Sequence, residues 1–596
     1  MGSPTFHPTA RRMAGGLGIL ILGAAGCAIA HDGSPARWKD RLPQLSPAQP
    51  GALLGSCESL VAGLAGLAHT TITGATTVAA GTLATAGQPI AEHCRVTGRM
   101  FERVSPVDGK TYSIQFELRL PKVWNGRFWH QGNGGIDGSV STALGNSGGG
   151  GPLTSALLQG FAVLSSDAGH TLAQGGPAFG LDPQARLDYG YQAVGKLTPM
   201  AKAAIATAYG RGPDRSYFGG CSNGGRHTLV TAARYADEYD GYMAGAPGYN
   251  LPLAALANIW GAQRYATVAT GDPVTAAGLE TAFTATERKL VAGAVLARCD
   301  ALDGVADGLV QDTRTCQARF NLQRDVPTCT GARDGTCLTQ AQKLVVDAIA
   351  KGATTSNGER FYAPFPYDGG LAGSNIAVWE FGAALNLDSG AVGTIFQVPP
   401  STAPLSNGPA FTLGLGIDAT LARLHATDVT YTESAMSFMT PPNVRDYNDV
   451  RRRGAKMIVY HGMADAIFSV EDTVRWYEGV DHGSGNRAED FVRLYRVPGM
   501  NHCSGGPTAD QADFITPLVR WVEQGVAPQE IVAGVRGAGN AAPVNTELPA
   551  GWSPTRSRPL CPYPSIARYN GHGDVERADS FRCVAPHRHG HDRDHD

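Results

Sequence analysis

The chain has 596 residues, which is too long for one ordinary compact domain and favours two domains or one domain with a large insertion. Its 49 Lys and Arg residues nearly balance 52 Asp and Glu residues, so no basic surface indicates a nucleic-acid-binding protein. A hydrophobic content of 43% is typical of a globular protein, and with 77 glycines short glycine motifs occur often by chance.

The first 30 residues have the pattern of a secretory signal peptide. Arg11 and Arg12 precede an apolar run over 15–22, and residues 28–30 (Ala-Ile-Ala) have the small-x-small form of a cleavage site. The run is too short to span a membrane, and no later stretch is long and apolar enough to do so. We therefore expect a secreted or periplasmic protein without a transmembrane segment, and Cys27 leaves a lipid anchor open as a less favoured alternative.

Ten cysteines remain after the predicted signal peptide, and an even number in an exported chain favours five disulfides. The alternative, scattered buried thiols, fits less well because the pairs 299/316, 329/337 and 561/583 are close in the sequence. The chain has no C-x-x-C motif, which argues against a zinc site. The ten are Cys57, Cys94, Cys221, Cys299, Cys316, Cys329, Cys337, Cys503, Cys561 and Cys583.

Short β-type runs alternate with turns in the first part of the mature chain. The clearest predicted strands are 70–79, 113–120 and 127–131, and the last runs into the glycine-rich loop 132–135. Where a catalytic serine follows further along the chain, a loop of this kind can supply one N–H group of an oxyanion hole. We predict the N–H of Gly132 for this role, with a plain turn as the alternative.

Residues 219–225 (Gly-Gly-Cys-Ser-Asn-Gly-Gly) contain the G-x-S-x-G pattern of a nucleophile elbow. An apolar run over 216–218 precedes them as the end of a strand, and 226–234 follows as a helix. In this context the serine hydroxyl is exposed on a tight turn, and glycines leave room where the strand and helix backbones crowd together. The pattern predicts Ser222 as a catalytic nucleophile and the N–H of Asn223 as an oxyanion donor.

A second match to G-x-S-x-G occurs over 145–149. It lies in a run of glycines, without an apolar strand before it or a helical pattern after it. We therefore interpret Ser147 as a loop residue, and the bare pattern carries little information in so glycine-rich a chain.

Alternating strands and helices predict an α/β fold with a mostly parallel sheet. After predicted strands at 161–166 and 242–247, the alternation stops near residue 248 and resumes with a strand at 455–460. An insertion of this size between core strands is typical of a lid over the carboxyl ends of the strands. We expect a core over 31–248 and 446–583, a lid over 249–445, and a disordered His-rich tail over 584–596.

Two further residues complete a predicted catalytic triad. Asp465 follows the strand that resumes the core, and His502 follows the next predicted strand, 491–497. With Ser222 they have the order Ser…Asp…His of α/β-hydrolases. In that chemistry the histidine takes the serine proton and returns it to the leaving group, while the aspartate fixes the histidine tautomer. Alternative bases, none of which follows the last core strand, are His170, His461 and His482.

Cysteines adjoin two of these three residues, because Cys221 precedes Ser222 and Cys503 follows His502. If the triad is correct, the two cysteines lie close enough for a disulfide that closes a loop of about 280 residues. With this Cys-Ser…Asp…His-Cys constellation, the chain resembles the tannase and feruloyl esterase family over nearly all of its mature length. The resemblance includes the elbow at 220–225, the loop at 131–132, the turn at 461–465 and the loop 499–503.

The resemblance implies the α/β-hydrolase fold with a large lid inserted between core strands. Hydrolases of mono(2-hydroxyethyl) terephthalate belong to the same family, and the chain is similar to those too. The resemblance also implies that the other cysteines pair in sequence order, as Cys57–Cys94, Cys299–Cys316, Cys329–Cys337 and Cys561–Cys583.

A loop in the predicted lid, residues 300–309, carries three aspartates interleaved with glycines. Such a loop suits calcium, which takes six or more oxygen ligands, although the EF-hand spacing is absent and a solvated acidic turn is the alternative. The resemblance implies a structural calcium ion here, which would rigidify the lid. Its implied ligands are the side chains of Asp300, Asp303 and Asp307 and the carbonyls of Val305 and Leu309.

The resemblance also indicates part of the substrate pocket. Phe468 matches a family position that packs on the ring of the acyl group, and we expect Trp379 to face the same pocket from the lid. Ordinary packing is the alternative for both residues. Family members that hydrolyse mono(2-hydroxyethyl) terephthalate hold the free carboxylate with a lid arginine, and residues 390–397 contain no arginine to match. An ester of a neutral phenolic acid, of feruloyl or galloyl type, therefore fits better.

These expectations combine into one functional hypothesis. The chain is a secreted serine carboxylic ester hydrolase that cleaves small esters of aromatic acids through an acyl-enzyme. The alternatives are a terephthalate-monoester hydrolase and, outside enzymes, an inactive binding protein on the same fold.

Overall fold

The structure, a computed structural model, describes residues 42–146 and 150–585. The predicted signal peptide with Cys27, the second motif serine Ser147 and nearly all of the predicted tail lie outside these residues. Within the described ranges, no helix combines the length and the apolar character that crossing a membrane requires.

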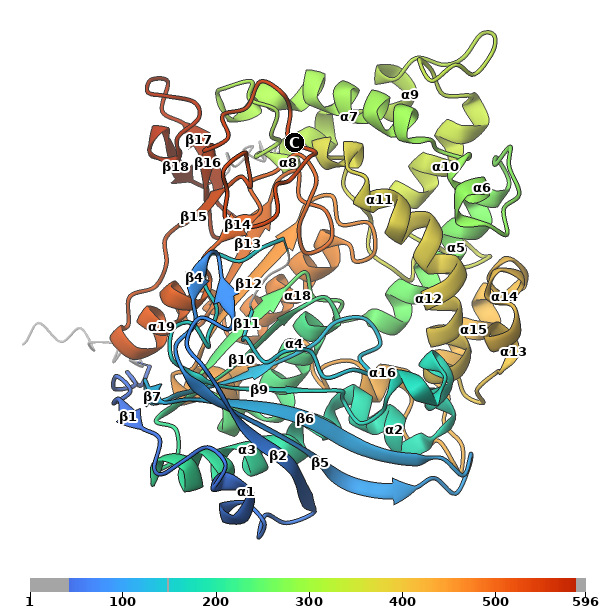
Figure 1. Ribbon diagram of the computed structural model, residues 1–596. Coiled ribbons are helices and arrows are strands. Elements are labelled where there is room, and N and C mark those ends of the chain that lie inside the picture. Colours follow the sequence, from blue (N-terminus) through green and yellow to red (C-terminus); the bar gives the residue numbers. More distant parts are fainter. Residues whose placement is uncertain (1–41, 147–149, 586–596) are drawn as a thin grey trace, which may run out of the picture. The chain divides into compact units, whose positions relative to one another are not determined.

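A nine-stranded sheet forms the centre of the fold, in the order β13-β12-β11-β10-β8-β9-β6-β5-β2 (Figure 1). The six strands from β13 to β9 in this order are parallel, and β6, β5 and β2 are antiparallel. The strands are β2 (Thr70–Val78), β5 (His93–Val104), β6 (Thr111–Pro121), β8 (Arg127–Gln131), β9 (Ala162–Ser166), β10 (Arg215–Cys221), β11 (Gly241–Gly245), β12 (Lys456–Gly462) and β13 (Val492–Val497). The predicted α/β fold with a mostly parallel sheet is confirmed.

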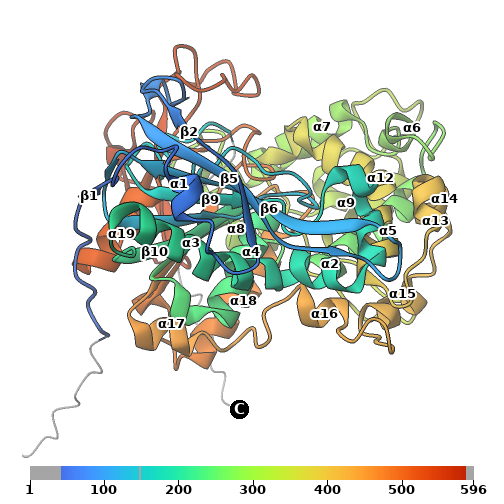
Figure 2. The same ribbon diagram turned by 60° about the horizontal axis from the view of Figure 1, so that its bottom comes forward.

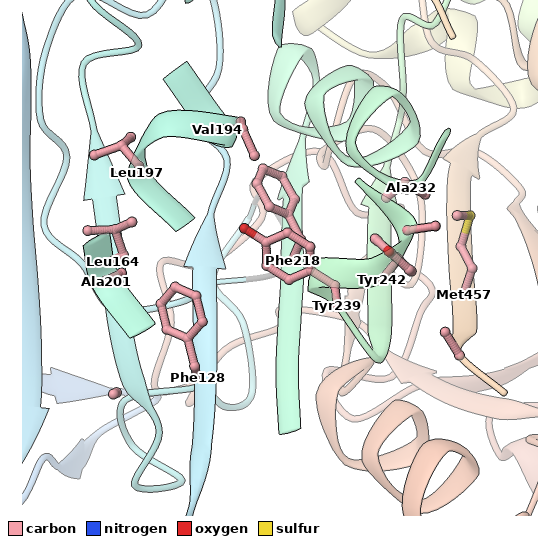
Figure 3. Close-up of a cluster of buried hydrophobic side chains, with 14 of the residues drawn as sticks. Phe128, Leu164, Val194, Leu197, Ala201, Phe218, Ala232, Tyr239, Tyr242 and Met457 are labelled. Carbon is pink, nitrogen blue, oxygen red and sulfur yellow. The ribbon is translucent and has the colours of Figure 1, made fainter. Parts of the chain in front are cut away.

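A buried hydrophobic cluster covers each face of the sheet. Successive residues of a strand point to opposite faces, so neighbours in sequence belong to different clusters. Phe128, Phe218 and Met457 lie in the buried cluster beneath the helices of one face (Figure 3). Trp129 and Tyr217, each one residue away along its strand, lie in the cluster on the other face. The first cluster includes side chains of α3 (Ala193–Tyr209), α4 (Asn223–Arg234) and α18 (Val470–Gly483), and the second includes side chains of α19 (Ile515–Gln524).

The chain between β11 and β12 is helical, and Figures 1 and 2 show most of these helices gathered on one side of the sheet. We keep the name lid for residues 249–445. Two lid segments, η7 (Val378–Ala383) and η8 (Ala391–Phe396), are π-helical, a local widening that is frequent at functional sites. The helices from β11 to β12 are α5 (Leu251–Ala266), α6 (Ala276–Glu280), α7 (Ala285–Cys299), α8 (Thr313–Arg319), α9 (Leu322–Asp325), α10 (Gln340–Ala350), α11 (Asn375–Ala377), α12 (Ala384–Gly390), α13 (Ala403–Ser406), α14 (Gly408–Gly414), α15 (Ile417–Leu424), α16 (Ala435–Phe438) and α17 (Asn448–Arg453).

Smaller elements complete the fold. A three-stranded sheet (β14, β15 and β16) and a hairpin lie after β13 in the sequence, and short pairs lie in the N-terminal part. These elements are α1 (Leu60–Gly63), α2 (Pro183–Leu187), β1 (Gly51–Ala52), β3 (Ala84–Thr85), β4 (Gln88–Pro89), β7 (Val123–Trp124), β14 (Gln511–Ala512), β15 (Ile531–Gly534), β16 (Ser557–Leu560), β17 (Ile566–Tyr569) and β18 (Phe581–Val584).

Candidate active site

Three side chains from three strand ends meet at the carboxyl edge of the parallel strands. His502 Nε2 lies 2.8 Å from Ser222 Oγ, and His502 Nδ1 lies 2.7 Å from Asp465 Oδ2. Ser222 follows β10, Asp465 follows β12, and His502 follows β13. The three residues predicted as a triad therefore form one hydrogen-bonded chain, with the spacing that proton transfer from the serine requires.

The turn that holds Ser222 has the geometry of a nucleophile elbow. Ser222 has φ 64° and ψ −127°, a region that a residue with a Cβ atom seldom occupies, and it begins helix α4. A Cβ atom on Gly220 or Gly224 would lie 2.2 or 2.4 Å from the carbonyl oxygen of Gly132. These glycines are required because the loop after β8 packs directly against the elbow.

The carboxylate of Asp465 is fully buried, and both of its oxygens accept hydrogen bonds. Its Oδ1 accepts the N–H groups of Ile467 and Phe468, each at 3.0 Å, while Oδ2 accepts from His502. Burial alone would raise the pKa of Asp465, but His502 and the hydrogen bonds from His461 and His502 hold it well below its ordinary value. Asp465 is therefore ionised at neutral pH and can stabilise a protonated His502.

His461, one of the alternative bases, takes a different role. Its Nε2 lies 3.2 Å from Asp465 Oδ2 and 3.0 Å from the carbonyl oxygen of Phe468, and its Nδ1 lies 2.9 Å from Thr473 Oγ1. Two acceptors face Nε2, so Nε2 carries the proton and Nδ1 accepts from the Thr473 hydroxyl. His461 thus supports the carboxylate from behind, while His502 is the histidine that reaches Ser222.

The predicted oxyanion donors have different surroundings. Asn223 is the first residue of α4, where a helix N–H has no acceptor within the helix, so its N–H is free to bind an oxyanion. In contrast, the N–H of Gly132 donates to the carbonyl of Gly219 at 2.9 Å, as a continuation of the β8–β10 pairing. This hydrogen bond argues against Gly132 as the second donor. Gly134, two residues later in the same loop, lies near Ser222, because a Cβ atom added to it would lie 3.8 Å from Ser222 Cβ.

A buried polar network behind the elbow was not anticipated from the sequence. Asn223 Nδ2 donates to Asp137 Oδ2 at 2.9 Å, and Arg226 Nε donates to Asn223 Oδ1 at 2.6 Å. His227 Nε2 lies 2.9 Å from the same Asp137 oxygen, and burial together with Arg226 lowers the pKa of His227 well below its ordinary value. The network holds the elbow helix to the oxyanion loop, and no spacing rule connects Asp137 with residues nearly ninety positions later.

Disulfides fasten the site and the rest of the molecule. Cys221 and Cys503 are joined, so the residue before Ser222 is bonded to the residue after His502 across 282 positions of sequence. The predicted pairing is confirmed throughout. The other disulfides are Cys57–Cys94, Cys299–Cys316, Cys329–Cys337 and Cys561–Cys583.

Two aromatic rings flank the catalytic histidine. The ring centroids of Trp379 and Phe468 lie 4.8 and 5.3 Å from that of His502, and both rings meet it edge-on. Trp379 is on the π-helical segment η7 of the lid, and both residues pack in the cluster that joins the lid to the core. This arrangement places aromatic surface from the lid and from the core against His502, whose Nε2 contacts Ser222 Oγ.

The acidic lid loop has features of a cation site without being a complete one. Asp300 accepts the N–H groups of Asp307 and Gly308, and Asp307 Oδ2 accepts from Arg558. Asp303 Oδ2 is buried without a hydrogen-bond partner, so the loop contains an unsatisfied anionic oxygen. As placed, the side chains of residues 42–146 and 150–585 include no group of three or more His, Cys, Asp or Glu that could hold a metal ion. Calcium therefore stays a prediction.

Comparison with known proteins identifies relatives over most of the chain. The model of a family described as tannase and feruloyl esterase matches residues 94–584. A mono(2-hydroxyethyl) terephthalate hydrolase of Piscinibacter sakaiensis is 39% identical over 529 residues, covering 83% of this chain and 85% of that protein. A probable feruloyl esterase of Arthroderma benhamiae is 28% identical over 497 residues, covering 78% of this chain and 81% of that protein.

Solved structures share the fold. Feruloyl esterase B from Aspergillus oryzae superposes with a TM-score of 0.69 at 24% identity, covering 89% of this chain and 99% of that chain. Tannin acyl hydrolase from Aspergillus niger superposes with a TM-score of 0.65 at 21% identity, covering 90% of this chain and 97% of that chain. At these identities the likeness shows the fold, which is the predicted α/β-hydrolase fold.

Proposed function

The chain belongs to the tannase and feruloyl esterase family and is a carboxylic ester hydrolase, and from this premise we propose that it cleaves esters of phenolic acids with Ser222 as the nucleophile. The observation that carries the proposal is the hydrogen-bonded chain from Ser222 through His502 to the buried, ionised Asp465. An inactive binding protein would not need a hydrogen-bonded Ser–His–Asp series at a strained elbow.

The reaction follows from the positions of the atoms. Ser222 Oγ attacks the ester carbonyl while His502 Nε2 takes its proton, and the imidazolium is stabilised by Asp465. In this proposal the N–H of Asn223 stabilises the oxyanion together with an N–H of the loop after β8, whose Gly134 lies near Ser222. His502 then gives its proton to the leaving alcohol. Water, activated by the same histidine, releases the aromatic acid from the acyl-enzyme.

The rings around His502 support an aromatic acyl group. Phe468 and Trp379 both meet the His502 ring at its edge, so an acyl ring bound beside Ser222 would contact apolar surface from the core and from the lid. No arginine occurs over 390–397, so this part of the lid offers no positive partner for a second carboxylate. Neutral feruloyl or galloyl esters are therefore the favoured substrates.

One observation favours a second candidate substrate. The relative in Piscinibacter sakaiensis, named a mono(2-hydroxyethyl) terephthalate hydrolase, is 39% identical, whereas the probable feruloyl esterase of Arthroderma benhamiae is 28% identical. Hydrolysis of terephthalate monoesters is thus the alternative to phenolic esters.

A direct rate comparison tests the substrate. We expect kcat/KM to be at least about tenfold higher for methyl ferulate or methyl gallate than for mono(2-hydroxyethyl) terephthalate, because an unpaired carboxylate in an apolar pocket costs about 1.4 kcal/mol or more. A higher value for the terephthalate ester would select the alternative substrate. No burst or turnover with any of them, including a p-nitrophenyl ester, would favour the binding protein.

Two further features are part of the proposal. Export is supported by the predicted signal peptide and by five disulfides, which persist in oxidising compartments. A calcium ion held by Asp300, Asp303 and Asp307 with the carbonyls of Val305 and Leu309 is supported by the orphaned oxygen of Asp303. The ion would neutralise the buried carboxylates and stiffen the loop.

A further inference from the structure

A groove lies between the lid and the core. Its volume is about 800 Å³, within the range of small-molecule sites. Lid segments that include α8 and Phe365 to Tyr367 form one wall, and α18 of the core, the end of β13 and Tyr563 form the other. The groove is lined by residues of both the lid and the core, as many ligand sites are.

The carboxylates and the arginines of the groove have different short-range partners. Three of its four carboxylates have partners other than these arginines: Asp312 accepts from Thr315, Asp347 pairs with Lys351, and Glu478 accepts from the Tyr563 hydroxyl. Burial raises the pKa of the fourth, Glu471, and Arg496 acts in the opposite direction. Within 4.0 Å of a carboxylate oxygen of the described residues, no ion pair is formed by the arginines of the groove, Arg314, Arg360, Arg475 and Arg496.

Arg496 is the central cation of this groove. Three of the arginines are exposed at its rim, whereas Arg496 is half-buried near the end of β13. Its guanidinium carbon lies 5.0 Å from the centre of the Tyr563 ring. Glu471 and Asp312 act on Arg496 electrostatically, but among the described residues no carboxylate oxygen forms an ion pair with it within 4.0 Å. Its planar fork of N–H donors, which matches a carboxylate, is therefore not used by a short ion pair.

Aromatic side chains supply the rest of the lining. Phe320 and Tyr367 lie on the lid wall with their ring centroids 4.9 Å apart, and Phe365 lines the same wall. Such surface favours a flat apolar ring over a small, strongly hydrated anion. We propose that this groove is a second ligand site, which binds a small aromatic carboxylate with its carboxylate on Arg496 and its ring against the aromatic lid wall.

Two structural connections link the proposed site to the candidate active site. A small cavity of about 60 Å³ shares Phe365 and Tyr367 with the groove and is lined on its other side by residues 463–466, which include Asp465. Arg496 is also the register partner of His461 in the β12–β13 pairing, and His461 contacts Asp465. The carboxylate class is also that of the acid released by ester hydrolysis, although the argument for the groove does not depend on the proposed substrate.

Binding is measured with the catalytic serine occupied, so that the active site cannot account for the signal. The full-length mature protein is inactivated with diethyl p-nitrophenyl phosphate, labelling of Ser222 is verified by mass spectrometry, and the product is titrated with 4-hydroxybenzoate by calorimetry. We expect saturable binding at one site, at least tenfold weaker binding of methyl 4-hydroxybenzoate, and no displacement by inorganic phosphate at matched ionic strength. An unlabelled Ser222 would count against the proposed nucleophile, and the groove would then be tested by comparing Arg496→Gln with Arg493→Gln in the unmodified protein.

Variants of one strand provide a matched control. Arg496→Gln should weaken binding of 4-hydroxybenzoate at least tenfold. Arg493→Gln should change it less than twofold, because Arg493 is also half-buried on β13 but stacks on Trp521 at the opposite face. If Arg496→Gln lowers the melting temperature by more than Arg493→Gln, the exposed rim variant Arg475→Gln replaces it, with an expected loss of at least threefold. Absence of saturable binding, or equal losses in the groove and control variants, would overturn the proposal.

Discussion

Two buried aspartates, Asp465 beside the nucleophile and Asp303 in the lid, differ in how the protein satisfies their carboxylates. Asp465 receives two backbone N–H groups and two histidine N–H groups, and its pKa lies below the ordinary value. Asp303 receives one N–H, from Val305, and burial together with the charges of Asp307 and Asp300 raises its pKa to about 7. Burial alone therefore does not decide the charge of a carboxylate; the hydrogen-bond donors and the charges around it do.

The largest effect on activity is expected when Ser222, the proposed nucleophile next to the Asp465–His502 pair, is replaced. Ser222→Ala should lower kcat by roughly 10⁴-fold or more, because it removes the attacking oxygen while leaving only oxyanion stabilisation and binding. Initial rates with a p-nitrophenyl ester measure the effect. Ser147→Ala is the control, because Ser147 has the same G-x-S-x-G pattern, and it should keep the rate of the unaltered enzyme. Comparable activity in Ser222→Ala would show that the nucleophile is another residue.

The carboxylate of Asp465 and one of its hydrogen-bond donors, His461, can be changed separately. Asp465→Asn should lower kcat roughly 10³- to 10⁴-fold, because the amide no longer holds His502 in the reactive tautomer or stabilises its protonated form. His461→Gln should cost about tenfold, since the Asp465 carboxylate keeps its two backbone donors and His502. The pH dependence of kcat separates the two roles: a change in the acidic limb is expected for His461→Gln, because loss of the His461 hydrogen bond raises the pKa of Asp465. An unchanged profile and rate in His461→Gln would exclude the supporting role.

Removing a disulfide of the active site and removing one of the lid should have different effects on stability and activity. Cys221→Ala/Cys503→Ala removes a link across 282 positions, for which the chain-entropy model predicts a loss on the order of 5 kcal/mol. Cys329→Ala/Cys337→Ala removes a link across 8 positions of the lid, and the same model predicts about 2–3 kcal/mol. Denaturant unfolding measures both. Activity should fall in the first variant only, because only that bond joins the elbow to the histidine loop; equal activity in both would contradict this assignment.

The smallest effect concerns the unsatisfied carboxylate of the lid. The pKa of Asp303 is raised from 3.8 to about 7, so its folded form binds the proton more tightly than the unfolded chain does. Its contribution to stability is fully present below pH about 4 and is lost as pH rises through about 7. In EDTA the melting temperature should therefore fall over this interval, and added Ca²⁺ should restore it. Asp303→Asn should remove both the pH slope and the response to Ca²⁺.

Much of the fold and of the site is local in the sequence and was predicted from it. The strands at 127–131, 161–166 and 491–497 agree with β8, β9 and β13 to within one residue, because period-two and buried apolar runs are local patterns. Ser222, Asp465 and His502 were predicted for the same reason, since each follows a strand whose end is visible in the sequence. The disulfide between Cys221 and Cys503 could be predicted once Ser222 and His502 were assumed to lie together.

Tertiary structure alone decided what depends on contacts between distant segments. The N–H of Gly132 is taken by Gly219 because β8 and β10 are neighbours in the sheet, which a strand prediction does not specify. The network from Asp137 to Asn223 and the groove around Arg496 likewise join residues that no spacing rule relates. Local sequence was enough to predict the candidate catalytic residues, because each lies in a recognisable local context, at the end of a strand or in a glycine turn. Which backbone groups remain free to take part was decided by packing, because a hydrogen-bond donor can serve only partners that the fold brings to it.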